Sequence, residues 1–111
     1  MKTYSGIRTG DGCAVAVTGS ATGQDGCRQL DPRFDLRTHS PTGFEWGYGG
    51  SGPAQLALAL AADVLGDDEA ALGIYQRLKF RVVARLAADH WALTEGELTA
   101  AIRSLGEAGG E

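Results

Sequence analysis

The chain has 111 residues, of which 43% are hydrophobic and 22% are charged, and its formal net charge at pH 7 is −4. This size and composition are typical of one globular domain. No run of about 18 apolar residues could span a membrane, and the acidic balance argues against general nucleic-acid binding, which relies on a basic surface.

The first residues, Met1 to Ser5, lack the apolar segment of a signal peptide, so we expect a cytoplasmic location in a bacterial host cell. Cys13 and Cys27 are too few for a disulfide framework. Together with His39 and His90, their spacing fits no known zinc finger or knuckle. We therefore expect reduced cysteines, no bound metal and no cofactor.

The first half of the chain predicts short strands separated by turns. Residues 3–8 and 13–18 read as strands, and the Asp-Gly turn between them predicts a hairpin. Residues 27–30 begin a third strand, which Asp31-Pro32 interrupts. The alternation over residues 34–38 predicts a fourth strand. The segment 19–26 is polar and is expected to be a flexible loop.

The second half predicts three helices, near 53–65, 69–86 and 95–105. Pro53 suits the first turn of the first helix, and Gly66 is its expected C-cap. Asp67 or Asp68 would cap the second helix, whose apolar residues lie on two sides and predict that it packs between layers. Residues 94–97 form a capping box for the third helix, which Gly106 would stop.

These elements define the expected fold. We predict a single α+β domain over residues 1–106, with a small antiparallel sheet from the N-terminal half packed against about three helices from the C-terminal half, and a flexible tail over 107–111. No helix alternates with each strand, so a parallel doubly wound sheet is disfavoured.

The glycine-rich segment 43–52 is the first candidate site. Its glycines and the free N–H groups at the start of the following helix could hold an anion, with Trp46 and Tyr48 stacking on a ring. The predicted contact residues are Trp46, Tyr48, Gly49, Gly50, Ser51 and Gly52. The alternative is a structural junction, in which a strand alternating at 44, 46 and 48 turns into its helix and Glu45 faces water.

A row of arginines on the second helix is the next candidate. Arg77, Arg81 and Arg85 are spaced at i, i+4 and i+8 and suit recognition of carboxylate or phosphate. The alternative is a solvated edge that pairs with carboxylates of the sheet side, namely Asp31, Asp35 or Glu45. If the arginines bind a ligand, at least one should share a groove beside the Pro53 helix with Trp46 and Tyr48.

Asp35, His39 and Ser40 are the residue types of a hydrolytic triad, but no Gly-x-Ser-x-Gly nucleophile motif is present. A strand would also hold the Cα atoms of Asp35 and His39 roughly 13 Å apart. We expect no catalytic residue here and interpret His39 as a side chain that fixes the turn. Trp91, between the second and third helices, is expected to be an apolar clasp.

Three blocks of sequence resemble a small prokaryotic family of unknown function. They are residues 4–6, residues 75–83 and, above all, the core His39-Ser40-Pro41-Thr42-Gly43-Phe44-Glu45-Trp46-Gly47-Tyr48 with its continuation to Ala57. Members of the family often carry asparagine at the position of Thr38. The resemblance implies no reaction, cofactor or catalytic residue, but it implies a setting on mobile elements such as plasmids and phages and a role in host–virus conflict.

Three hypotheses for the function follow. The first is a non-enzymatic domain that binds a small anionic or nucleotide ligand, or an acidic partner surface, through the glycine segment and the arginines. The second is an anti-defence protein of a phage or plasmid that inhibits a host immune complex by protein–protein binding. The third, less favoured, is a small hydrolase. None of them involves a membrane.

Overall fold

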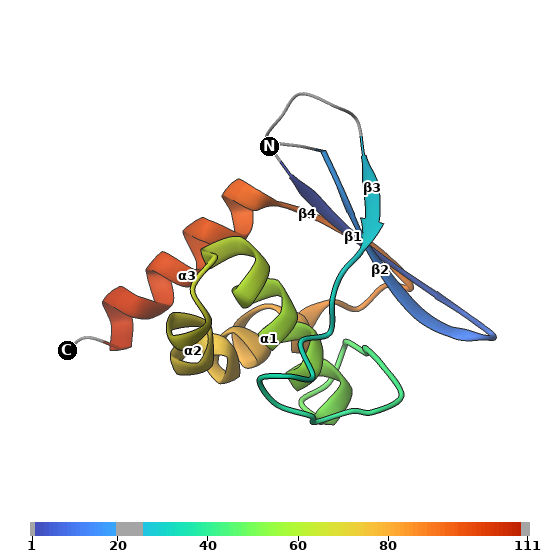
Figure 1. Ribbon diagram of the computed structural model, residues 1–111, viewed down its shortest axis with the longest axis horizontal. Helices are drawn as coiled ribbons and strands as arrows, with labels where there is room; N and C mark the ends of the chain where they lie inside the picture. Colours follow the sequence, from blue (N-terminus) through green and yellow to red (C-terminus); the bar gives the residue numbers. More distant parts are fainter. Residues whose placement is uncertain (1, 20–25, 110–111) are drawn as a thin grey trace.

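The computed structural model describes residues 2–19 and 26–109, and it confirms the α+β class. The sheet has four strands, and Figure 1 shows the helices on one side of it. The strand order is β3-β2-β1-β4, and every neighbouring pair is antiparallel. The sheet therefore has an inner face toward the helices and an outer face away from them.

The three predicted N-terminal strands are confirmed, as β1 (Thr3–Thr9), β2 (Gly12–Thr18) and β3 (Cys27–Gln29). β1 and β2 form the expected hairpin, in which Thr9 pairs with Gly12 and Gly12 adopts a φ of 124° that favours glycine. Of the loop predicted at 19–26, residues 20–25 lie outside the described residues.

The fourth strand is not the predicted one. Residues 34–36 form a turn, in which the Leu36 N–H donates to the Arg33 carbonyl and Arg33 has a φ of +58°. The fourth strand is β4 (His90–Thr94), which pairs with β1 from Ile7 opposite His90 to Thr3 opposite Thr94. The sheet thus needs a segment from the C-terminal half of the chain, which the sequence interpretation assigned to a connection.

The central helix is α1 (Ser51–Leu65), which is buried continuously from Gly52 to Ala62. It begins two residues before the predicted start and ends at Gly66, which takes the left-handed conformation of a C-cap, as predicted. A helix that is apolar on all sides belongs in the interior. The prediction that the second helix is the enclosed one is therefore wrong, because α1 takes that place.

The other helices are α2 (Asp68–Arg81) and α3 (Glu95–Gly109). The Asp67 carboxylate accepts from the Ala70 N–H at 3.1 Å, and the predicted capping box of α3 forms through Thr94 and Glu97. α2 ends five residues earlier than predicted and is followed by a short 3-10 helix, η1 (Val83–Arg85).

Two local features explain the ends of these helices. α2 ends at two consecutive β-branched valines, which disfavour the helix, and the Val83 carbonyl accepts from the Gly47 N–H. α3 continues through Gly106, where the sequence predicted its end, since a single glycine is tolerated within a helix. Residues 110–111 of the predicted tail lie outside the described residues. No helix of the described ranges is long and apolar enough to cross a membrane.

One buried amide joins α1 to the segment before it. Gln55 is fully buried, and its Nε2 donates to the carbonyls of Pro32 and Arg37 at 2.6 and 3.0 Å. Its Oε1 accepts from the backbone N–H groups of His39 and Ser40 at 2.7 and 3.1 Å. All four hydrogen-bonding positions of the side chain are therefore filled, and residues 32–40 are held against α1.

We predict that Gln55→Leu lowers the free energy of unfolding by about 2–5 kcal/mol. Four backbone groups of part-buried hydrogen bonds lose their partner, and each one that water cannot reach costs about 1–3 kcal/mol. Urea denaturation followed by circular dichroism would measure the change. Gln76→Leu, at an exposed position of α2, is the matched control and should change stability by less than about 0.5 kcal/mol. Equal effects of the two substitutions would contradict this role of Gln55.

Candidate partner-binding surface

The glycine-rich segment 43–50 runs beside the end of α2 before it enters α1. The Gly43 N–H closes a turn on the Ser40 carbonyl, and Gly43 and Gly47 adopt φ values of 120° and 90°. The Gly47 N–H donates to the Val83 carbonyl at 3.0 Å. The segment is not the alternating strand of the junction hypothesis, but it does place residues 47–50 next to residues 80–86.

Trp46 lies in the core, with only 1% of its surface exposed. Its Nε1 donates to the Ala88 carbonyl at 2.9 Å. The Trp91 ring meets it edge-on at 5.5 Å between centroids, and the Arg8 guanidinium lies 4.9 Å from its ring centroid. The protein itself occupies the surroundings of this ring, so Trp46 is an internal anchor of the segment and is not placed to stack on a ligand. Trp91 contributes to the same cluster from β4.

The junction hypothesis had Glu45 merely facing water, but its side chain, which is 38% exposed, is also ion-paired. Its carboxylate accepts from Arg8 Nη2 at 2.7 Å, and the same Nη2 also donates to the Trp46 carbonyl at 2.9 Å. Hydrogen bonding from Arg8 lowers the pKa of Glu45 from its ordinary value, against a smaller opposing effect of burial. Arg8 also pairs with Asp89 at 2.8 Å, so one guanidinium joins the sheet, the glycine segment and the approach to β4.

Tyr48 and Phe80 are exposed aromatic side chains at the point where the segment passes α2. Their exposed fractions are 52% and 59%. The Tyr48 ring packs over Gly50, and the Phe80 ring lies so close to Gly49 that a Cβ there would stand 3.0 Å from it. Lys79 Nζ lies 4.2 Å from the centroid of the Phe80 ring. The sequence interpretation missed Phe80, because its apolar neighbours in the chain suggested a core position.

The three arginines predicted as site residues are all exposed, but they do not lie on one straight helical row. Arg77 and Arg81 belong to α2, whereas Arg85 lies in η1. Arg77 Nη1 donates to the Leu105 carbonyl of α3 at 3.4 Å. None of the three arginines, nor Lys79, forms an ion pair within the part of the chain that the structure describes.

The carboxylates proposed as partners for these arginines are engaged elsewhere. Asp35 pairs with Arg33 at 3.0 Å, Glu45 pairs with Arg8, and Asp31 accepts from the Arg33 backbone N–H. The hypothesis that these arginines pair with Asp31, Asp35 or Glu45 is therefore wrong. We call the exposed residues of this region the basic–aromatic surface, and it comprises Tyr48, Arg77, Phe80, Arg81 and Arg85, with the buried Lys79 beneath Phe80.

Two of the residues named for a possible triad have other partners. Asp35 is paired with Arg33, and His39 Nε2 shares a hydrogen bond of 2.7 Å with the Tyr75 hydroxyl. His39 therefore fixes its turn, through Tyr75 and through its backbone bond to Gln55. Pro53 lies buried in the first turn of α1, where its missing N–H leaves no bond unmade.

Residues that could ligate a metal are scattered. Cys13 is partly buried, which raises the pKa of its thiol, and Cys27 is exposed on β3. Within residues 2–19 and 26–109, no three His, Cys, Asp or Glu side chains gather where a metal ion could bind.

The fold and this surface define a small α+β domain with an exposed cluster of aromatic and cationic side chains. The chain belongs to a family of unknown function, DUF6166, whose model matches residues 4–104. The matched range includes the core block from His39 to Tyr48 on which the resemblance was based. No curated protein and no solved structure matches the chain significantly.

We predict that Glu45→Gln removes part of the acid sensitivity of the fold. Because the folded-state pKa of Glu45 is lowered, its ion pair stabilises the protein fully above the ordinary glutamate pKa of about 4.3, and this contribution is lost as the pH falls through the lower folded-state value. Melting temperatures measured from pH 7 to pH 3 should fall less steeply below pH 5 in the variant. Glu69→Gln, at an exposed position in α2, should leave the profile as in the wild type.

Proposed function

We propose that this protein is a non-enzymatic binding domain that recognises an acidic surface of a partner protein through the basic–aromatic surface. One observation carries the proposal. In the described structure, Lys2, Arg8, Arg28 and Arg33 are each paired with a carboxylate, whereas the exposed Arg77, Arg81 and Arg85 have no such partner. Phe80 lies between Arg77 and Arg81 in α2, and its ring packs against Gly49 of the segment that carries Tyr48, in a chain whose net charge is −4.

The chemistry of these side chains suits a protein partner. Arginine forks bind carboxylates in a bidentate manner, and aromatic and arginine side chains dominate the binding energy of protein interfaces. Tyr48 and Phe80 suit the role of anchors, because each ring packs against the backbone of a glycine. The Tyr48 ring packs against Gly50, and the Phe80 ring packs against Gly49. Like charges crowded on one surface repel one another, and a carboxylate-bearing partner would relieve that repulsion.

A nucleotide or another small anion is the alternative ligand for the same region. In its favour, the N-cap Gly50 has no side-chain cap and the first turn of α1 has no acidic residue, so N–H groups near Ser51 and Gly52 could meet an anion. Against it, Trp46 is buried, and the stem of Glu45 packs against Gly52. Of the two rings predicted to stack on a base, only Tyr48 is exposed, so the glycine segment cannot hold a base between two of its own aromatic side chains.

The mobile-element setting implied by the family resemblance gives the partner a possible identity. A phage- or plasmid-encoded protein that binds an acidic surface of a host immune complex would act as an anti-defence protein by occupying that surface. A cytoplasmic location in the bacterial host belongs to this hypothesis, and neighbouring phage or defence genes would support it.

We predict that labelled acidic 15-residue peptides, with a central leucine or phenylalanine, bind the wild-type protein in a fluorescence polarisation assay and that binding weakens with added salt. Arg81→Glu should weaken binding at least tenfold, because an attractive charge becomes repulsive. Tyr48→Ala should weaken it about 5- to 30-fold, corresponding to the roughly 1–2 kcal/mol of an aromatic anchor.

The matched control is Arg37→Glu. Arg37 is also exposed and without an ion pair in the described residues, but it belongs to the segment whose Arg33 pairs with Asp68 at the opposite end of α2. ATP and a 20-nucleotide single-stranded DNA serve as competing probes. Tighter binding of ATP than of any peptide would favour the small-anion alternative, and equal losses with Arg37→Glu and Arg81→Glu would contradict this surface.

A further inference from the structure

The outer face of the sheet carries no formally charged side chain. Strand register assigns to it every second residue of the four strands, counted from Thr3, Gly12, Cys27 and His90. None of these strand residues, all of which the structure describes, is Lys, Arg, Asp or Glu, although 22% of the chain is charged. The charged strand residues Arg8 and Arg28 lie on the inner face, where each is ion-paired.

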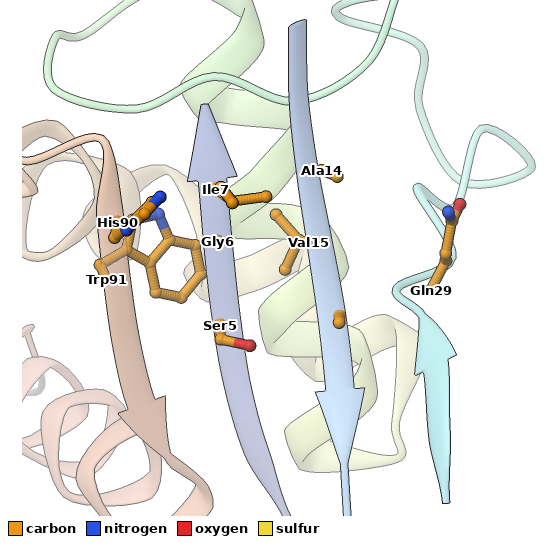
Figure 2. A pocket seen from close by; sticks show the side chains of 9 residues that line it. Ser5, Gly6, Ile7, Ala14, Val15, Gln29, His90 and Trp91 are labelled. Atoms are coloured by element: carbon orange, nitrogen blue, oxygen red, sulfur yellow. The ribbon is translucent and has the colours of Figure 1, made fainter. Parts of the chain in front are cut away.

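This face is open to its surroundings. None of its residues is buried, and Ile7 near its centre is 44% exposed. A groove of about 380 Å³ lies across the middle strands, and its outer-face side chains are those of Ser5, Ile7, Ala14, Ala16, Gln29 and His90. Figure 2 shows the residues that line this groove, with α1 behind the strands.

We propose that the outer face is the interface of a symmetric homodimer, in which two copies of this chain pack sheet against sheet. Two copies that each carry a net charge of −4 repel one another, and an uncharged face is where they approach without burying unpaired charge. The face is self-complementary: Ile7 projects from it, and the small side chains of Ala14 and Ala16 leave room for the partner's isoleucine. A two-fold axis lets each copy use the same surface.

The size of the face sets the strength of this dimer. The four strands β1, β2, β3 and β4 have seven, seven, three and five residues. At about 3.3 Å per residue and about 4.8 Å between strands, they cover on the order of 350 Å² per copy and about 700 Å² in total. This area is below the range of stable protein interfaces and fits a weak, transient dimer. We therefore expect a dissociation constant in the high micromolar range, with a monomer at low micromolar concentration.

Sedimentation velocity from 1 to 500 μM tests the proposal. The wild type should show a concentration-dependent shift toward twice the monomer mass. Ala16→Arg should raise the dissociation constant at least tenfold, because it places two like charges in a dry interface. Ala100→Arg, at an exposed position of α3, makes the same change in net charge and should dimerise as the wild type does.

A second measurement locates the interface without any variant. In a dilution series of ¹H–¹⁵N spectra, the amide shifts of Ser5, Ile7, Ala16 and Ala92 should move together, and those of Tyr48 and Phe80 should not. A monomer at 500 μM would overturn the proposal, as would shifts confined to another face. Because the basic–aromatic surface lies on the loop before α1 and the end of α2, failure of the dimer leaves peptide binding there unaffected, and the two proposals fail separately.

Discussion

The structure depends on a single polar side chain near the N-terminal end of a buried helix. α1 is enclosed over most of its length, and a helix in that position has no polar side by which to fix its rotation or its neighbours. Gln55 supplies that constraint, because four backbone groups of residues 32–40 bond to it. His39, held in this way, reaches Tyr75 and so ties α2 to the same point. The block from His39 to Gln55 thus has a structural role, because it holds residues 32–40 against α1.

The other end of α1 is tied to the sheet by a charged cluster. Asp63 accepts hydrogen bonds from the Tyr4 hydroxyl at 2.6 Å, from Arg28 at 2.8 Å and from Lys2 at 3.1 Å. Burial alone would raise the pKa of Asp63, but these hydrogen bonds outweigh it and the pKa is lowered. Arg8 of β1 bonds in the same way to Glu45 in the segment before α1. The cations of the sheet side therefore connect the sheet to the helical layer.

This use of charge inside the fold gives the surfaces their different characters. Cations that join layers are neutralised by carboxylates, so they are not available to a partner. Arg77 and Arg81 of α2 have no ion pair among the described residues and flank Phe80, and the strand residues of the outer face include no Lys, Arg, Asp or Glu. The two surfaces therefore suit different partners, one acidic and one uncharged. The family assignment names no reaction, and Asp35 and His39 are engaged with Arg33 and Tyr75, respectively.

The sequence by itself determined what short-range chemistry controls. The Asp-Gly hairpin, the Asp67 cap, the capping box at Thr94 and the Gly66 C-cap all formed as predicted, because each needs only residues a few positions apart. The α+β class followed from the change in composition between the two halves. Thr38 makes a similarly local contact, in which its hydroxyl donates to the Phe34 carbonyl at 3.4 Å.

Only the tertiary structure decided which segments meet. Apolar and polar residues do alternate over residues 34–38, but hydrogen bonds to Gln55 and Arg33 hold that segment as a turn. β1 pairs instead with residues 90–94 from the other end of the chain. Trp46 lies inside because Arg8 and Trp91 surround it, and both are distant in sequence. Local pattern cannot choose between two apolar segments for one sheet edge, or between core and surface for one aromatic ring. That choice depends on long-range contacts, which exist only once the chain is packed.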